Sequence, residues 1–454
     1  FQSNQGVYQT GDPAGDNYVS VRTSNPAVRM RASAAPLSGM FGGFRGAQDM
    51  PFFEVMEGEL KPGDKVVVTI GDKSGGGRGF RMQSFANDGL RNPLFVSFGA
   101  GTQLMSLKPV LFSVSGGPVA RVRGFAPSTA SVGETVTVSV RGEDRWRNRA
   151  TGRQPAYDVM VNGERVSRIA AGDRAITLID TLKFDRPGVY RLSFRSDDGR
   201  ITGEANPIWV REGKQAGVYW GETHAHSGFT EGEGSIDFFY TFGRDDARLD
   251  FLGMSEHDTW MDDWEWEQLR SAAKRYDKPG EFVPFLAYEW TAVTTFGGHH
   301  NVFFRTAEGR QRTPIQTNPT LTQLYEGLKK RNDPKDVLVI PHAHQTGEYR
   351  ISDADVENLV EVLSLHGAFE WFGQKYLEQG HEVGFIAASD DHLSHPGYAA
   401  ANGGLGYRSG LAAVVAPEKS RDAIFDSLKA RRTYATSGER IILGDCVITN
   451  DGSR

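Results

Sequence analysis

The sequence has very little of what defines several common protein classes. It contains one cysteine, Cys446, so neither an intramolecular disulfide nor a cage of cysteine thiolates around a metal ion can form. It contains no apolar run near the ~18 residues that a membrane helix needs, and we expect no membrane span. The chain opens at Phe1 rather than Met, which is typical of a processed or trimmed chain. We therefore favour a periplasmic or secreted location over a cytoplasmic one.

Charge is unevenly distributed along the chain, although the net charge is only -6. Residues 1–212 contain 27 Lys and Arg against 21 Asp and Glu, whereas residues 213–454 contain 24 against 36. All 11 histidines lie in the second part, from His224 to His395. A surface that binds nucleic acid would carry a basic stripe. The acidic, histidine-rich second part instead indicates a metal site, and we expect no nucleic-acid partner.

The length of 454 residues is too great for one core and predicts two to four domains. We expect residues 1–115 to form a β-rich domain, with a β-branched strand at 65–70. Residues 116–212 predict an immunoglobulin-like β-sandwich, because 135–140 alternates with period two and Asn162-Gly163 is a strong type I′ hairpin turn. These β domains offer surfaces for interaction with a partner.

Residues 213–454 alternate between strands and helices, which favours a parallel sheet or barrel. Five apolar strands in this part are each followed by metal-ligand residue types. In α/β barrels the carboxyl ends of the strands form the active site. The residues that follow the five strands are His224 and His226; Glu256, His257 and Asp258; Glu289; His342 and His344; and Asp390, Asp391 and His392.

These residue types indicate a divalent metal centre. Imidazole and carboxylate bind Zn, Mn or Fe, and no thiolate is available to select a softer metal. Residues i and i+2 of a strand share a face, so His224 and His226 can chelate one ion, as can Asp390 and His392. Two ions about 3.5–4 Å apart need a carboxylate between them, and Glu289 is our candidate for this bridge. We expect metal-activated hydroxide to attack a phosphorus or carbonyl centre.

Each signal also has a structural interpretation. An isolated His-x-His on a strand is more often a core or surface feature than a ligand pair, and Glu289 alone would be read as a paired carboxylate. His366 supports a metal ligand or has a purely structural role, and His381 is a solvated helix cap. Five strand ends that agree are hard to explain by packing, because unpaired buried polar groups are costly. The metal interpretation is therefore preferred for the cluster as a whole.

At these positions, over roughly residues 215–445, the chain resembles the polymerase-and-histidinol-phosphatase (PHP) superfamily. It is most similar to an uncharacterised bacterial branch known as a domain of unknown function. The segments that carry the resemblance are Gly221-Glu222-Thr223-His224-Ala225-His226, Thr230-Glu231-Gly232, Ser255-Glu256-His257-Asp258, Glu289, His300-Asn301, Pro341-His342, Ser389-Asp390-Asp391-His392 and the closing stretch 430–438. Glu stands at 222, 231 and 256, where the superfamily usually has Asp.

The resemblance implies that an N-terminal all-β, sandwich-like region precedes a distorted (β/α)7 barrel with two or three divalent ions. Three groups of ligands follow from it. The first metal would be held by His224, His226, Glu289 and Asp390; the second by Glu289, His342 and either His299 or His300; and the third by Glu231, His257 and His392.

Most characterised relatives in this superfamily cleave phosphate esters, so we expect a metal-dependent phosphoesterase acting on a small-molecule or ester substrate. The same chemistry could open a carboxylic ester, lactone or amide, and a non-catalytic binding module with a structural metal is a further alternative. The candidate catalytic groups are Glu289, His257, His344 and Arg350. Arg350 lies eight residues after His342 and is the nearest cation for a phosphate group.

Overall fold

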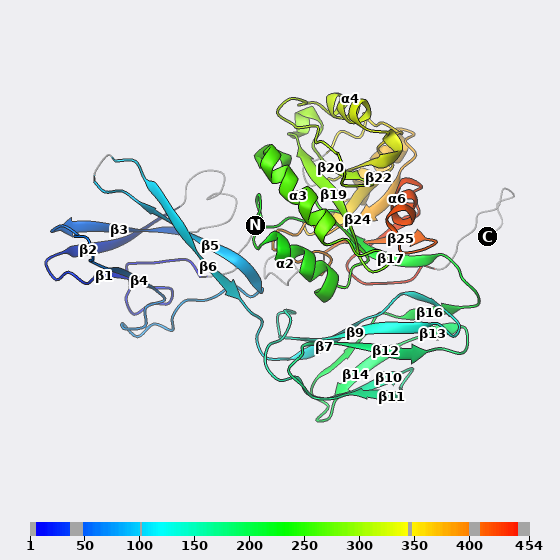
Figure 1. Cartoon of the computed structure of the whole chain (residues 1–454), viewed down its shortest axis with the longest axis horizontal. Helices are drawn as coiled ribbons and strands as arrows, with labels where there is room; N and C mark the ends of the chain where they lie inside the picture. The colour runs from blue at the N-terminus through cyan, green and yellow to red at the C-terminus, as the bar shows by residue number, and fades with distance from the viewer. Residues whose placement is uncertain (1–5, 37–48, 100–101, 344–346, 399–408, 444–454) are drawn as a thin grey trace. The chain divides into compact units, whose positions relative to one another are not determined.

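The computed structural model describes residues 6–36, 49–99, 102–343, 347–398 and 409–443. Strands dominate the described chain, as Figure 1 shows. Contacts divide the described residues into two compact units, the first ending at Phe85 and the second beginning at Ala86. The predicted domain boundaries near residues 115 and 212 remain predictions.

The first unit contains two antiparallel pairs of strands. They are β1 (Val19–Thr23) with β4 (Val66–Ile70), and β2 (Arg29–Pro36) with β3 (Asp49–Glu57). β4 confirms the strand predicted from its β-branched run, although all five of its side chains are exposed. Buried apolar residues of this unit include Val19, Val28 and Phe85.

The second unit begins with strands alone. The antiparallel pair β5 (Asn87–Val96) and β6 (Met105–Val114) comes first. Three sheets follow, with strand orders β11-β10-β14-β15, β12-β9-β7 and β13-β16-β8. Their strands are β7 (Arg121–Phe125), β8 (Thr129–Ser131), β9 (Thr135–Glu143), β10 (Tyr157–Val161), β11 (Glu164–Ile169), β12 (Ile176–Lys183), β13 (Gly188–Tyr190), β14 (Leu192–Ser196), β15 (Thr202–Glu204) and β16 (Ile208–Arg211).

We call β7 to β16 the three-sheet region. One buried core joins its sheets, with Val138, Val159 and Val210 each supplied by a different sheet. The predicted hairpin at Asn162-Gly163 is confirmed, since this pair connects β10 to β11 with φ values of 49° and 90°. Positive φ at both central residues is what a type I′ turn requires.

The rest of the second unit is built on a seven-stranded sheet in the order β21-β20-β19-β18-β17-β25-β26. A smaller sheet has the order β23-β22-β24. The strands are β17 (Gly217–Glu222), β18 (Phe251–Met254), β19 (Val283–Thr291), β20 (His299–Phe304), β21 (Val337–Pro341), β22 (Leu359–Ser364), β23 (Gly367–Ala368), β24 (Gly384–Ala387), β25 (Leu411–Ala416) and β26 (Thr433–Thr436).

The seven-stranded sheet is mixed, which corrects the expectation of a wholly parallel one. β17, β18 and β19 are parallel, but β20, β21, β25 and β26 each pair antiparallel with a neighbour. The short link 292–298 between β19 and β20 explains the first reversal, because a parallel crossover needs a dozen or more residues. The smaller sheet contacts β21 through β22 and β26 through β24. A distorted (β/α)7 barrel remains a prediction.

Helices cover both faces of this sheet. Alternate strand residues enter two cores: Leu252 and Leu286 pack with α3 and α4, whereas Phe251 and Phe285 pack with α6. The helices are α2 (Ile236–Thr241), α3 (Asp263–Arg275), α4 (Leu321–Arg331), α5 (Glu370–Glu378) and α6 (Arg421–Lys429), with a π-helical turn at Phe242–Asp246 and 3-10 turns at Asp258–Trp260, Thr294–Phe296 and Pro334–Asp336.

Local sequence sets where the longer helices begin. Asp262 and Glu265 form a capping box at the start of α3, and Thr320 and Gln323 form one at the start of α4. Each box satisfies backbone N–H groups that the first helical turn leaves without partners. In the part of the chain that the structure describes, no helix has both the length and the apolar character needed to cross a bilayer.

Candidate metal centre

Histidine and carboxylate side chains from six strands meet at one place in the second unit. They lie just beyond the carboxyl ends of β17, β18, β21 and β24, near the end of β19 and at the start of β20. We call this group the histidine–carboxylate cluster. Its members are His224, His226, Glu231, His257, Glu289, His299, His342, Asp390 and His392.

Glu289 lies at the centre of this cluster. Its Oε2 is 3.4 Å from His224 Nε2, 3.3 Å from His226 Nε2 and 3.2 Å from His257 Nδ1. Its Oε1 is 2.6 Å from His299 Nδ1 and 3.0 Å from His342 Nε2. The two oxygens of one carboxylate therefore face two separate groups of imidazoles. A carboxylate that bridges two metal ions needs this arrangement.

Asp390 joins His224, His226 and Glu289 in a first group of possible metal-binding atoms. Its Oδ1 lies 3.3 Å from His224 Nε2 and 3.4 Å from His226 Nε2. Asp390 has a φ of 52°, a left-handed conformation that is uncommon for a residue other than glycine. Residues held in sparsely populated backbone conformations cluster at functional sites. With Glu289, this group offers two nitrogens and two oxygens to one cation.

A third group of donors lies beside His226. Ligand atoms of His226, His257 and His392 lie within 4.8 Å of one another, and His257 Nε2 is 2.9 Å from Glu231 Oε2. The imidazole of His226 stacks on His257 and His392 with ring centroids 4.4 Å and 4.1 Å apart. Glu231 therefore lies beside this group, and its role as a metal ligand remains a prediction.

The donors fit a divalent cation. Among the described residues, His224 Nε2, His226 Nε2 and Glu289 Oε2 are buried without a hydrogen-bond partner. Buried polar atoms that lack partners are rare and costly, and a bound cation would supply the partner of these three atoms. Nitrogen and oxygen donors without thiolate suit Zn, Mn or Fe.

Protonation in the cluster follows from burial and opposing charge. Burial raises the pKa of Glu289, but the nearby imidazoles of His257 and His299 outweigh this and hold it well below its usual value. Burial, followed by the charge on His224, lowers the pKa of His342 to about 3. Burial opposes the charge on His224, yet the carboxylates of Asp390 and Glu361 raise its pKa well above normal. In the absence of a cation, protons on imidazoles therefore balance the negative charge of the carboxylates. Binding of a metal ion would displace these protons.

Glu361, on β22, is a functional candidate that sequence analysis missed. It is buried, and its Oε2 lies 3.0 Å from His224 Nδ1, on the side of the ring away from Glu289. Metal-binding histidines usually donate their second N–H to a carboxylate or carbonyl, which fixes the tautomer and the orientation of the ring. The sequence did contain a signal for Glu361, because a glutamate inside the apolar strand Leu359–Ser364 needs a buried partner.

Other contacts orient side chains of the histidine–carboxylate cluster. Thr291 Oγ1 is 3.0 Å from His257 Nδ1, and His366 Nε2 is 3.1 Å from Asp390 Oδ2. The carboxylate of Glu222 accepts hydrogen bonds from the backbone N–H of His224 and from that of Ser389, at 3.0 and 2.9 Å. His366 thus contacts a cluster carboxylate, consistent with the supporting role considered for it.

Two of the predicted site residues do not belong to the cluster. His300 follows His299 on β20 and so faces the other way; its Nε2 is 3.7 Å from Glu357. Of the two alternatives for the second metal, only His299 therefore faces Glu289. The Arg350 side chain is 67% exposed and pairs with Glu348. His344 lies outside the described residues.

We predict that Glu361→Gln weakens metal binding by about 10–100-fold, the usual cost of losing a supporting carboxylate. Glutamine keeps the shape of the side chain but removes the negative charge behind His224. Competition between the protein and a metal-sensitive dye measures the effect. Glu357→Gln is the matched control, because Glu357 is equally buried but faces Tyr325 and His300. Equal affinities in both variants would contradict the assigned role.

Glu357 also predicts a pH dependence of stability. Burial raises its pKa from 4.5 to about 8. Between these values the folded state binds more protons than the unfolded state, so this carboxyl's contribution to stability is lost as pH rises. Glu357→Gln resembles the protonated carboxyl and removes the dependence. Thermal unfolding should therefore favour the variant increasingly over wild type from pH 5 to pH 8. A difference that is constant with pH would contradict this.

Comparisons with known proteins found similarity to several proteins without an assigned activity. The family described as "Protein of unknown function (DUF3604)" matches residues 240–348 and 398–444. An uncharacterized protein of Chlamydia muridarum is 22% identical over 87% of this chain and 69% of its own length. One of Chlamydia trachomatis is 21% identical over 73% of this chain and 58% of its own length. The matched family segments contain His257, Glu289, His299 and His342.

Similarity to solved structures is weak. A two-domain protein from Bacteroides vulgatus, described as containing a predicted PHP-like metal-dependent phosphoesterase, has a TM-score of 0.36 and 18% identity. The alignment covers 49% of this chain and 65% of that chain. This chain thus spans less than two thirds of that structure and of the Chlamydia trachomatis relative.

Proposed function

We propose that this protein is a metal-dependent hydrolase whose centre is the histidine–carboxylate cluster, and that it cleaves phosphate esters. The observation that carries the proposal is the position of Glu289, whose two carboxylate oxygens face different groups of imidazoles at 2.6–3.4 Å. Apolar packing does not explain why this carboxylate is buried among five histidines. Two cations, one on each side of Glu289, would satisfy these donors.

The residues of the chain have separate roles in this proposal. His224, His226, Asp390 and Glu289 would hold one ion, and His299, His342 and Glu289 a second; His257, His392 and Glu231 would hold a third if it binds. When bound, divalent ions polarise a substrate oxygen and lower the pKa of a coordinated water to about 7. Glu361, Thr291 and His366 keep ligand side chains in position through the contacts described above.

Exposure favours an enzyme over a purely structural metal site. The side chains of His224, His226, Glu289, Asp390, His342 and His392 are at most 4% exposed. In contrast, His299 and Glu231 are each 14% exposed, and His366 is 19% exposed. Catalytic centres keep a position open for water or substrate, whereas structural centres are closed. The partial exposure of these three side chains leaves the centre partly open, which favours a catalytic site.

The choice of a phosphate ester rests on the resemblance of the sequence motifs to the PHP superfamily. One observation favours the second candidate, hydrolysis of a carboxylic ester, lactone or amide. Arg350, the cation predicted to hold a phosphate, is largely exposed and pairs with Glu348. A neutral substrate needs no such cation.

Turnover of p-nitrophenyl phosphate, bis-p-nitrophenyl phosphate and p-nitrophenyl acetate with added Mn or Zn tests the proposal. We expect chelator-sensitive hydrolysis of a phosphate ester that is faster than hydrolysis of the acetate. Faster acetate hydrolysis, equally sensitive to chelator, would replace the phosphoesterase proposal with the second candidate. Absence of chelator-sensitive turnover on all three would contradict the proposal that these bonds are cleaved here.

A further inference from the structure

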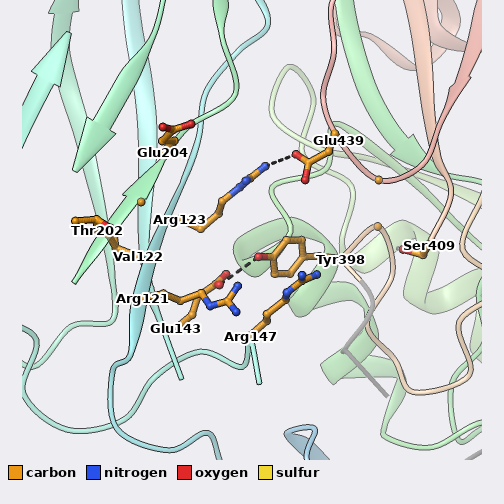
Figure 2. A pocket seen from close by; sticks show the side chains of 13 residues that line it. Arg121, Val122, Arg123, Glu143, Arg147, Thr202, Glu204, Tyr398, Ser409 and Glu439 are labelled. Carbon is orange, nitrogen blue, oxygen red and sulfur yellow. Dashed lines mark hydrogen bonds and ion pairs between the residues drawn. The ribbon is translucent and has the colours of Figure 1, made fainter. Parts of the chain in front are cut away.

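A pocket lies away from the histidine–carboxylate cluster, between strands of the three-sheet region and residues from 397 to 439. Its volume is about 360 Å³, within the range of small-molecule sites. Strands β7, β9 and β15 line one side, and residues 397–398, 409 and 438–439 line the other. Figure 2 shows its charged side chains and the two polar contacts across it.

The strand pairing explains why charged groups gather in this pocket. Arg121 and Arg123 alternate with the core residue Val122 on β7, so both leave the same face of the sheet. On the neighbouring β9, Glu143 is the cross-strand partner of Arg121, and Arg141 is the partner of Arg123. Side chains of paired residues share a face. Four charged groups thus lie together on the face directed away from the core.

Most of these charged side chains have partners that hold them in place around the pocket. Arg123 pairs with Glu439 at 2.9 Å, and the hydroxyl of Tyr398 donates to Glu143 Oε2 at 3.2 Å. Both contacts are drawn in Figure 2. Arg141 is fully buried and lies 3.3 Å from Asp246. These bonds join distant segments of the second unit, so the pocket is a defined part of it.

Arg121 and Arg147 differ from these residues. Within the described ranges, neither guanidinium has a carboxylate at ion-pair distance. Figure 2 shows both on the same side of the pocket, beside the bond between Glu143 and Tyr398. The exposed carboxylate of Glu204 also lines the pocket. The guanidinium groups of Arg121 and Arg147 are therefore available to donate hydrogen bonds to a ligand.

The backbone at Arg147 gives independent support. Arg147 has a φ of 71° in a tight turn in which its N–H donates to the carbonyl of Asp144 at 3.2 Å. This left-handed conformation suits glycine or asparagine and is uncommon for a long side chain. Glycine would relieve the strain but supply no guanidinium. Residues held in such conformations are concentrated at ligand sites.

We propose that this pocket binds a small molecule that carries a carboxylate or a phosphate, held by the guanidinium groups of Arg121 and Arg147. The planar fork of arginine matches both anions, since two parallel N–H bonds can reach two oxygens. The site is distinct from the metal centre, and the inference does not depend on the proposed hydrolase activity.

The pocket wall is nevertheless bonded to the segments that carry the metal ligands. The N–H of Gly397, which lines the pocket beside Tyr398, donates to Glu222 Oε2 at 3.0 Å. The other oxygen of Glu222 accepts from the backbone of His224 and Ser389. One buried carboxylate thus connects the pocket to two strand ends of the histidine–carboxylate cluster.

Calorimetric titration of the full chain with inorganic phosphate and, separately, with succinate tests this inference. We expect at least one of the two to saturate a site whose affinity falls about tenfold or more in Arg121→Gln and in Arg147→Gly. The preferred anion distinguishes a phosphate ligand from a carboxylate ligand. Arg147→Gly is the sharper variant, because glycine suits φ 71° and its thermal midpoint should equal or exceed that of wild type.

Arg186→Gln serves as the matched control, since Arg186 is an exposed arginine of the three-sheet region outside the pocket. Its affinity for either anion should equal that of wild type. Binding that is unchanged in Arg121→Gln and Arg147→Gly would place the anion elsewhere, for example at the metal centre, and would overturn the inference. Failure of both anions to saturate wild type would overturn it as well.

Discussion

Replacing Glu289 by glutamine is expected to abolish binding of the bridged pair of metal ions and to reduce turnover by on the order of 10³ or more. An amide has no negative charge and only one oxygen, so it cannot face both groups of imidazoles as the carboxylate does. Bound metal supplies several kcal/mol of charge stabilisation in the transition state, and each ~1.4 kcal/mol is a tenfold change in rate. Elemental analysis and steady-state kinetics measure the two effects.

The matched control is Glu326→Gln, because Glu326 is an exposed glutamate on α4. This variant should keep the metal content and turnover of wild type. Loss of metal and turnover in Glu289→Gln but not in Glu326→Gln supports the central position of Glu289. Wild-type metal content and turnover in Glu289→Gln would refute the assignment.

Removing metal with a chelator is expected to lower the thermal midpoint as well as turnover. Without a cation, the buried carboxylates of Glu289, Asp390 and Glu361 are balanced only by protons on neighbouring imidazoles. A ligand that binds only the folded state stabilises it by about 2.7 kcal/mol when present at 100 times its Kd. Thermal unfolding with and without chelator measures this, and added Mn or Zn should restore the midpoint.

The Glu289→Gln variant is the control for this experiment. With little metal to lose, its midpoint should change much less on addition of chelator. A wild-type midpoint that the chelator leaves unchanged would show that no metal contributes to stability.

The parts of the centre that were predictable from sequence are those that depend on local pattern. His224 and His226, and likewise Asp390 and His392, are two residues apart just beyond apolar strands. In both pairs the side chains reach the same cluster. Glu289 was a candidate because it is an acidic residue at the end of an apolar strand, where a two-metal site would need a bridging carboxylate. Such features follow from strand geometry, in which alternate residues share a face.

What sequence could not settle depends on tertiary arrangement. Which of His299 and His300 faces Glu289 depends on how β20 pairs with β19, and its antiparallel direction was not anticipated. Glu361 lies on the separate sheet that β22 forms, so only the fold shows that it faces His224. Arg350 was chosen for its charge and its distance along the chain, neither of which fixes the direction of a side chain.

The pocket that contains Arg121 and Arg147 could not be predicted either, because its residues are far apart in the sequence. Arg121 and Arg147 are separated from Tyr398 and Glu439 by more than 200 residues, yet they line one cavity. No local periodicity connects these segments. The signal that did exist was the alternation of arginine with apolar residues on β7, which indicated a charged face without showing what it would meet.

Anomalous diffraction from crystals grown with Zn or Mn tests the central claim most directly, because it locates bound ions without reference to activity. We expect at least two peaks about 3.5–4 Å apart, the usual separation in two-metal sites. One should lie among His224, His226 and Asp390 and the other beside His299 and His342, with the Glu289 carboxylate between them. A map with no peak at these side chains, from protein whose elemental analysis also shows no metal, would contradict it.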